Sequence, residues 1–465
     1  MKTSVTIIIG IVFILILYLL IRGAKKYFSS LTDDFSESEN HISIQEMLTN
    51  FMYIIILGVI LLIVVTVIAG AFPNITFGAA DTGAVPLDRF SAQNLKRMAL
   101  LAATRAKYLM TNFSTIIIGV LIVIALVAWA MDKMTLDKKN CEAMNELYKD
   151  FPPIASISGG TGYDKTFNLK DYYIKSAYNC CCAGNYKNDF VNICALKDCI
   201  KQGVRCLDFE IYSVNNLPVI AASAVDDYSI KETYNTVKFV DAMETIRDYA
   251  FANSTSPCAD DPLILHFRIM SKNQHIYNEM AKDLSNTLGS YLLDKQYSYE
   301  NHGSNIGRIP LKTLKSKVLI IVDKSNAVFA ETELDEYVNL ASNSAFMRCS
   351  RFHDVKYCPD IKELIEYNKP NMTICIPDLS DKAINYSAPI AQELGCQMIA
   401  LSYQKSDNNL KYYNGLFDSA GSAFILKPDR LREKIICTKD PEPIPKEYLY
   451  DQQDFKVAGD LDFNI

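Results

Sequence analysis

Two carboxylates, Asp208 and Glu210, lie two positions apart within residues 206–212, where apolar side chains alternate with polar or charged ones. Alternation with a period of two is typical of a β-strand and would place both carboxylates on one face of it. Two acids on one strand face are suited to binding a cation, to an ion-pair network or to a solvated surface. A second apolar stretch, residues 217–222, follows a short turn that contains asparagine. We therefore expect the pair in a parallel or mixed sheet.

The elements that would position this pair follow residue 150. Residues 263–267 and 318–322 are continuously apolar, as buried parallel strands are. Residues 239–251 and 275–293 have helical periodicity. Further short strands are expected at residues 398–403 and 424–426. This alternation of strands with helices predicts a (β/α) barrel.

The composition excludes several classes of partner. The net charge is −6 and no tract rich in lysine and arginine is present, so we expect no nucleic-acid partner. The 13 cysteines do not follow the spacing of a zinc module, so a structural metal is not expected. Three consecutive cysteines at residues 180–182 favour a disulfide in that loop, the alternative being lipid modification if the loop meets the membrane.

Three stretches in residues 1–150 have the composition of transmembrane helices: residues 4–21, 51–72 and 114–131. Each is free of charged residues and close to the ~20 residues that span a bilayer. Basic residues follow the first stretch without a cleavage motif, so we expect an uncleaved anchor. An all-α, multi-pass membrane region is therefore predicted. Its orientation stays open because basic residues flank both sides about equally.

Several motifs of the globular part resemble the phosphoinositide-specific phospholipase C family. The X half of that family is similar to Gly-Val-Arg-Cys-Leu-Asp-Phe-Glu at 203–210, Leu-Pro-Val-Ile at 217–220 and Pro-Leu-Ile-Leu-His-Phe at 262–267. The Y half is similar to Tyr-Asn-Lys-Pro at 367–370, Gly-Cys-Gln-Met-Ile-Ala-Leu at 395–401 and Phe-Ile-Leu-Lys-Pro at 424–428. The motifs follow one another in the order of the family.

The resemblance implies an α/β fold, a distorted TIM (β/α)8 barrel of phospholipase C type, after the three-helix membrane region. The X-like half would occupy residues 151–325 and the Y-like half residues 366–437. Residues 326–365 would form the linker between them. Residues 438–465, rich in proline and acids, would be an extended tail.

The resemblance also implies where the catalytic groups of the family would lie. One family histidine takes the proton from the inositol 2-hydroxyl and a second stabilises developing charge. Their positions are occupied here by Tyr178 and Ala222. Tyrosine, with an ordinary pKa near 10, is a poor base at neutral pH, and alanine transfers no proton. We therefore expect no catalytic residue and a pseudoenzyme.

The calcium site that the family uses would be altered as well. Asn179, Asp208 and Glu210 match three ligand positions of the family, with Asp and Glu exchanged. At the fourth position, a glutamate in the family, this chain has Arg268, which cannot be deprotonated. We expect the calcium site to be lost and no cofactor to be bound. Because unpaired buried carboxylates are costly, Arg268 should pair with Asp208 or Glu210.

Other family positions point the same way. Two family lysines and an arginine that hold phosphates are replaced by Ile321, Asp323 and Leu416, although Lys324 is adjacent. Among the five histidines, His266 alone is placed on a predicted barrel strand, two residues before Arg268. We expect it to be a structural histidine that is hydrogen-bonded to a neighbour.

These features predict a membrane-anchored, catalytically inactive phospholipase C-like protein that acts as a structural or protein-binding module. Its partners would be the lipid bilayer and other structural proteins, such as capsid or membrane-complex subunits. One setting that fits is the inner membrane of a virion, where the chain would be a minor capsid component. The alternative is an active phosphoinositide phosphodiesterase with rearranged catalytic residues. A phosphoinositide-binding sensor without turnover is a third reading.

Overall fold

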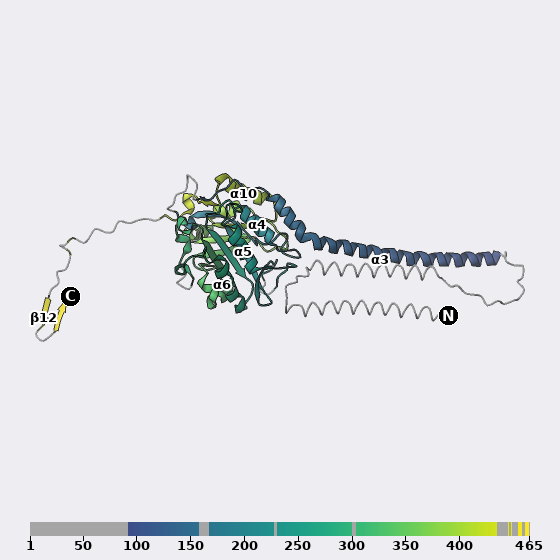
Figure 1. The fold of residues 1–465 in the computed structure, drawn as a ribbon, viewed down its shortest axis with the longest axis horizontal. Coiled ribbons are helices and arrows are strands. Elements are labelled where there is room, and N and C mark those ends of the chain that lie inside the picture. Colours follow the sequence, from purple (N-terminus) through teal and green to yellow (C-terminus); the bar gives the residue numbers. More distant parts are fainter. Residues whose placement is uncertain are drawn as a thin grey trace. The chain divides into compact units, whose positions relative to one another are not determined.

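The computed structural model describes residues 92–157, 167–226, 230–299 and 304–434, positions 445 and 448, and a hairpin of β12 (Asp454–Val457) and β13 (Leu461–Asn464). The chain divides into two compact units, Met1–Glu146 and Leu147–Ile465 (Figure 1). The predicted spans at 4–21 and 51–72 and most of the predicted tail at 438–465 lie outside the described residues.

The described part of the first unit belongs to one long helix, α3 (Ala92–Leu147), whose last residue falls in the second unit and which includes the third predicted span at 114–131. Large apolar side chains of this helix are more than half exposed, among them Leu121, Ile124 and Trp129. Across the described ranges, no helix meets the combined length and hydropathy needed to cross a membrane.

Eight parallel strands form the centre of the second unit. They are β1 (Tyr172–Ala177), β2 (Cys206–Val214), β5 (Leu263–Ile269), β6 (Val318–Asp323), β7 (Leu340–Ser342), β8 (Met347–Arg351), β9 (Met372–Ile376) and β10 (Met398–Leu401). Their order is β7-β6-β5-β2-β1-β10-β9-β8, with parallel pairing at each step. The two end strands, β7 and β8, lie side by side. The sheet is therefore a nearly closed parallel barrel, which confirms the predicted barrel class.

Three further antiparallel strands make the sheet mixed, two of them paired directly with barrel strands. β3 (Leu217–Ala221) pairs with β2 and with β4 (Val237–Lys238), and β11 (Phe424–Leu426) pairs with β1. Asn215 and Asn216, with φ of 53° and 61°, form the turn from β2 to β3. Asparagine tolerates this left-handed backbone, which suits a tight hairpin turn.

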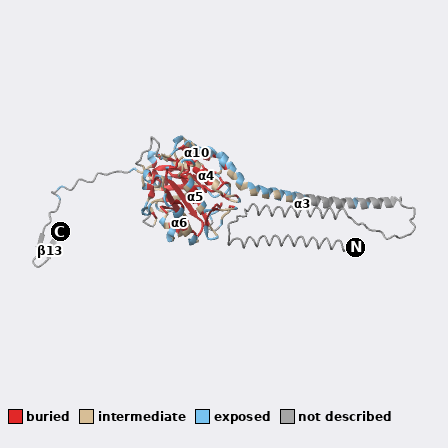
Figure 2. Cartoon of the chain, in the orientation of Figure 1, coloured by how far each residue is buried: buried red, intermediate tan, exposed pale blue. Residues whose placement is uncertain are grey.

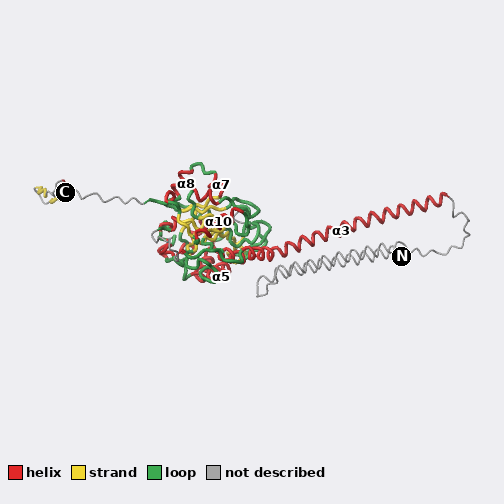
Figure 3. The backbone as a smooth tube through the Cα atoms, turned by 90° about the horizontal axis from the view of Figure 1, so that it is seen from above, coloured by secondary structure: helices red, strands yellow, loops and turns green. Residues whose placement is uncertain are grey.

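Helices and loops surround the strands (Figure 3). The α-helices are α4 (Ile193–Lys201), α5 (Phe239–Tyr249), α6 (Gln274–Leu288), α7 (Phe352–Lys356), α8 (Ile361–Tyr367), α9 (Ala388–Glu393) and α10 (Asn408–Ala420). The 3-10 helices are η2 (Leu169–Asp171), η3 (Lys295–Tyr297), η4 (Ile306–Arg308), η5 (Leu311–Leu314), η6 (Ala327–Glu331), η7 (Glu333–Glu336) and η8 (Asp429–Leu431). In α6, the Asn273 side chain caps the first turn and Ile276, Met280 and Leu284 bury one face.

Alternation along β2 and β5 separates a helix-facing side from a barrel-facing side. Phe209 and Phe267, on neighbouring strands, contact each other, and Phe267 also packs edge-to-face on Phe239 of α5. Buried residues follow the strands through the centre of the unit (Figure 2). Asp208 precedes Phe209 on β2 and His266 precedes Phe267 on β5. Because side chains alternate along a strand, both point to the opposite side, into the barrel.

Residues 326–365, expected as a linker, contain η6, η7, β7, β8 and α7. They thus supply two strands of the barrel rather than a separate insertion. The strands were missed because β7 has three residues and β8, Met347–Arg351, carries mainly polar side chains.

The prediction of a disulfide in the 180–182 loop is wrong. Cys180, Cys181 and Cys182 are free thiols and all three are buried. Burial raises the pKa of the Cys181 thiol, which keeps it protonated and unreactive.

Candidate functional site

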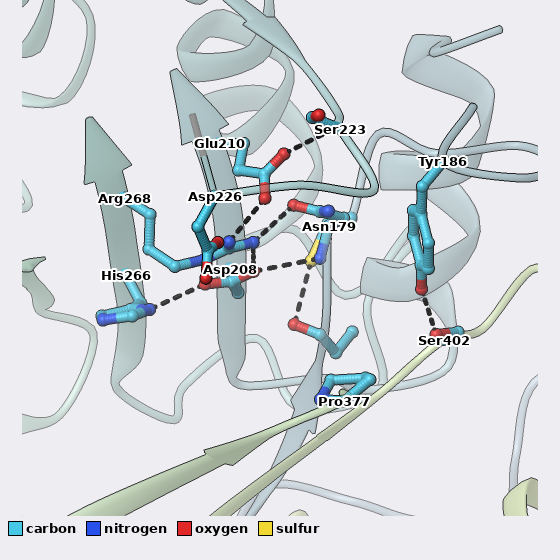
Figure 4. Close-up of polar contacts among 12 residues, drawn as sticks. Asn179, Tyr186, Asp208, Glu210, Ser223, Asp226, His266, Arg268, Pro377 and Ser402 are labelled. Carbon is cyan, nitrogen blue, oxygen red and sulfur yellow. Dashed lines mark hydrogen bonds and ion pairs between the residues drawn. The ribbon is translucent and has the colours of Figure 1, made fainter. Parts of the chain in front are cut away.

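The predicted site residues lie on neighbouring strands inside the barrel (Figure 4). Asp208 and Glu210 are on β2, and their partners across the parallel ladder on β5 are His266 and Arg268, respectively. Because the two strands pair in this register, both carboxylates and both nitrogen-bearing side chains lie on the same face. All four side chains are buried, none being more than 2% exposed.

Arg268 contacts every oxygen-bearing side chain of the predicted cation site. Its Nη1 donates to Glu210 Oε1 at 2.5 Å, and its Nε and Nη2 donate to Asp208 at 3.0 and 2.8 Å. Nη2 also donates to Asn179 Oδ1 at 2.8 Å. The ion pairs predicted from the sequence are therefore present, with both carboxylates rather than with one.

Tyr178 and Asn179 reach this cluster from the end of β1. The Arg268 guanidinium lies 4.7 Å from the centre of the Tyr178 ring, a cation–π arrangement. Asn179 adopts a φ of +44°, and its backbone N–H donates to Asp208 Oδ2 at 3.2 Å. Burial raises the pKa of Tyr178 further above its ordinary value, although Arg268 opposes the change. The phenol therefore stays protonated across the physiological range.

Asp208 has all its acceptor sites filled. Oδ1 accepts from Arg268 Nε and contacts His266 Nδ1 at 2.7 Å, and Oδ2 accepts from Arg268 Nη2 and from the Asn179 amide. The other ring nitrogen, Nε2, lies 2.9 Å from the Ser342 hydroxyl oxygen on β7. His266 is thus hydrogen-bonded within the barrel, as expected from the sequence, although Ser342 was not foreseen as its partner.

Glu210 is held from a second side by the loop after β3. The backbone N–H of Ser223 donates to Glu210 Oε2 at 2.9 Å, and the Tyr212 hydroxyl lies 3.4 Å from the same oxygen. Ala222, at the second histidine position implied by the resemblance, precedes this contact and is fully buried. Its methyl group offers no donor or acceptor to the cluster.

The ionisation of the two acids differs. Burial raises the pKa of Asp208, but the charge of Arg268 and the hydrogen bonds from His266 and Arg268 outweigh burial and bring this pKa well below its ordinary value. For Glu210, burial is only partly offset by Arg268 and its pKa lies above the ordinary value. Burial lowers the pKa of Arg268, but Asp208, Tyr178 and Glu210 together raise it above its ordinary value. Arg268 thus donates two hydrogen bonds to Asp208 and one to Glu210, so Asp208 shares more of the guanidinium.

A cavity of about 210 Å³ lies at the carboxyl ends of the barrel strands, and Arg268 is one of the residues that line it. Its other polar walls include Asp226, Asp323, Asn343 and Arg351. Arg351 contacts both carboxylate oxygens of Asp226 at 2.6 and 2.8 Å and donates to the Pro377 carbonyl at 2.7 Å. The loop after β3 is thus tied to the ends of β8 and β9.

Of the three positions at which the family's phosphate-binding residues are replaced, one lines the cavity and two do not. Asp323 lines the cavity, Ile321 is buried on β6, and Leu416 lies on α10 away from these residues. Sequence reasoning missed Ser342, Ser223 and Arg351. Ser342 and Arg351 lie in β7 and β8, whose residues carried no strand signal, and Ser223 contributes through its backbone.

Two domains of a known protein family match the chain in consecutive ranges. The X domain of phosphatidylinositol-specific phospholipase C matches residues 166–324, and the Y domain matches residues 324–430. This chain belongs to the phosphatidylinositol-specific phospholipase C family. The two matches abut at residue 324, so within this family barrel β7 and β8 fall in the Y domain.

Relatives of the barrel are distant in sequence. The human 1-phosphatidylinositol 4,5-bisphosphate phosphodiesterase zeta-1 is 23% identical over 327 residues, which cover 58% of this chain and 51% of the relative. The chain thus spans about half the length of that curated relative. Among solved structures, PLC21 of S. officinalis has 22% identity and a TM-score of 0.48, covering 58% of this chain and 38% of its own. A calcium-dependent phosphoinositol-specific phospholipase C from Pseudomonas sp has 9% identity and a TM-score of 0.36. The match covers 56% of this chain and 98% of the Pseudomonas chain.

Proposed function

We propose that this chain is a membrane-anchored phospholipase C-like protein that has no phospholipase C activity and acts as a structural or protein-binding module. The observation that carries the proposal is the position of Arg268. Its guanidinium donates to Asp208, Glu210 and Asn179, the three side chains that match calcium-ligand positions of the family. A permanent internal cation takes the place of a bound one.

The arranged residues do not fit calcium. Calcium takes six to eight oxygen ligands at about 2.3–2.6 Å. The oxygens of Asp208, Glu210 and Asn179 lie within 3.0 Å of Arg268 nitrogens, so an ion bound to them would lie against a guanidinium that keeps its charge. Binding would require Arg268 to leave its three partners. The proposed function therefore includes no step on a metal.

The proton-transfer positions support the same proposal. The Tyr178 ring lies against Arg268, and burial raises the pKa of its hydroxyl. Ala222 is buried and carries only a methyl group. General acid–base catalysis contributes about 10²–10⁴ to a rate and needs a titrating group at the reacting atoms. Neither position supplies one near neutral pH.

The proposed membrane attachment rests on the apolar sequence stretches and on α3. Seven large apolar side chains of this helix are between 55% and 61% exposed: Ile118, Leu121, Ile122, Ile124, Leu126, Trp129 and Met131. A contiguous apolar surface of this kind marks a membrane or protein contact. The proposal places it in a lipid bilayer, with structural proteins such as capsid or membrane-complex subunits as partners of the barrel. A virion inner membrane is the setting we propose.

An assay of lipid cleavage tests the proposed function. The full chain, reconstituted in vesicles that contain phosphatidylinositol 4,5-bisphosphate, is incubated with and without calcium, and released inositol phosphate is measured. The human zeta-1 enzyme serves as the positive control. We expect release equal to that from empty vesicles. Calcium-dependent release would instead favour the alternative, an active phosphodiesterase with rearranged residues.

A further inference from the structure

The cavity at the strand ends is lined by charged side chains whose charges do not cancel. Two arginines line it, and each is paired with acids. Arg351 donates to both carboxylate oxygens of Asp226, at 2.6 and 2.8 Å. Arg268 donates to Asp208 and to Glu210, so these two acids share its charge. The arginines therefore leave no positive charge in excess of the acids that they contact.

One further carboxylate in the cavity wall, that of Asp323, has only neutral partners. Its Oδ1 accepts from the backbone N–H and the hydroxyl of Ser325, both at 3.0 Å, and from the Asn343 amide at 2.8 Å. In the described part of the chain, Oδ2 has no donor and no lysine or arginine forms an ion pair with this carboxylate. Lys324, the next residue, donates to the Tyr299 hydroxyl at 3.0 Å and does not line the cavity. Asp323 thus gives the cavity a net negative charge.

Apolar side chains form part of the same wall, which suits an organic cation better than a hydrated ion. Ile269, Met270 and Ile376 line the cavity together with the charged residues. The cavity volume of about 210 Å³ is below the ~300–1,000 Å³ of pockets that hold drug-sized ligands, so a small ligand fits. A short alkyl chain would contact the apolar side chains, and an ammonium group at its end would donate to Asp323 Oδ2.

We propose that this cavity binds the ammonium group of a short primary amine, either a free amine or a lysine side chain, with Asp323 as the anion that it contacts. A primary amine of this kind has an ordinary pKa above 10 and is charged at neutral pH. Its N–H groups form charge-assisted hydrogen bonds with the carboxylate. The same negative charge disfavours phosphate groups. This binding is separate from lipid cleavage and does not depend on the proposed loss of that activity.

Binding of n-butylamine to the full chain in detergent tests the proposal. Saturation-transfer NMR compares it with butyrate, which has a chain of similar length and the opposite charge, and we expect binding of the amine only. Asp323→Asn keeps an oxygen that accepts from Ser325 and Asn343 but loses the charge, so the amine should bind at least about 10-fold more weakly. The matched control is Asp354→Asn, which alters an exposed acid that does not line the cavity and should leave the affinity unchanged.

A thiol in the cavity wall locates the bound amine. Cys349 lines the cavity, whereas Cys358, which is also partly exposed, does not. Methyl methanethiosulfonate transfers a methylthio group to a thiol: an S–S bond forms, methanesulfinate leaves, and the thiol proton passes to solvent. Peptide mass spectrometry measures the rate at each cysteine. In the wild type n-butylamine should slow the reaction of Cys349 and leave that of Cys358 unchanged, and in Asp323→Asn it should slow neither.

Nα-acetyl-lysine amide, as a second probe, separates the two sources of the ammonium group. Binding as tight as that of n-butylamine supports a lysine side chain of a partner protein, and weaker binding supports a free amine. Thermal unfolding confirms that each variant is folded. Butyrate bound as tightly as the amine, an equal affinity for the amine in the wild type and in Asp323→Asn, or no slowing at Cys349 would overturn the proposal.

Discussion

Glu210 and Arg268 are ladder partners on the parallel strands β2 and β5, and Arg268 Nη1 lies 2.5 Å from Glu210 Oε1. The backbone register of the two strands therefore places the acidic and the basic side chain next to each other. The same guanidinium reaches Asp208 at 2.8 Å, so one cation neutralises two buried acids in part. Glu210 keeps a raised pKa, which is expected where one positive charge serves two carboxylates.

Removing Arg268 should destabilise the barrel strongly. Arg268→Met leaves Asp208 and Glu210 buried without their cation, and breaking a buried pair in this way costs about 3–5 kcal/mol. Urea unfolding of the full chain measures the loss. A second variant that also carries Asp208→Asn and Glu210→Gln should recover more than half of it.

The matched control is Arg247→Ala, which removes an exposed ion pair with Asp248 on α5. Its unfolding midpoint should stay within error of the wild type because exposed pairs contribute little. An equal loss of stability in Arg247→Ala and Arg268→Met would show that the buried ion pairs of Arg268 stabilise the chain no more than an exposed pair does.

Lys175 should make stability depend on pH in the alkaline range. Its Nζ is buried, has no hydrogen-bond partner and lies 3.8 Å from Asp418 Oδ1. Burial lowers the pKa of Lys175 to about 8. An unfolded chain binds this proton up to about pH 10.4, so the unfolded state holds more protons between these values. Stability should therefore rise as the pH rises from about 8 to about 10.

Lys175→Met should abolish that rise and stabilise the chain by about 1–3 kcal/mol at neutral pH, since it removes a buried amine that makes no hydrogen bond and has its nearest carboxylate oxygen, on Asp418, at 3.8 Å. Unfolding at neutral pH and at about pH 9.5 measures both effects. Lys170→Met is the control, because Lys170 is equally buried but pairs with Asp171 and Glu433. This control should lose stability, and a gain in both variants would refute the reasoning from the missing hydrogen bond of Lys175.

Trp129 reports directly on the proposed membrane contact of α3. It is the single tryptophan of the chain and its side chain is 61% exposed. In vesicles of brominated phosphatidylcholine its fluorescence should be quenched, whereas aqueous iodide should have little effect, because the indole would lie among the lipids. Quenching by iodide but not by brominated lipid would place this part of α3 in water.

The sequence predicts strands where apolar residues are continuous, as at β5 and β6, because burial on both sides leaves an unmistakable pattern. It does not reveal β7 or β8, because strands of three or five residues with polar side chains are stabilised by their neighbours rather than by their own composition. The pairing of Arg268 follows from charge and alternation. The contact of His266 with Ser342 joins residues 76 positions apart, on strands β5 and β7 that lie on either side of β6.

The most direct test of the internal cation is calcium-dependent stability. Thermal unfolding of the wild type and of Arg268→Glu is compared in about 10 mM calcium and in magnesium. Arg268→Glu gives four oxygen-bearing side chains at the site, so calcium should raise its midpoint while the wild-type midpoint stays unchanged. A calcium-specific rise in the wild type would contradict the assignment of Arg268 as the resident cation of this barrel.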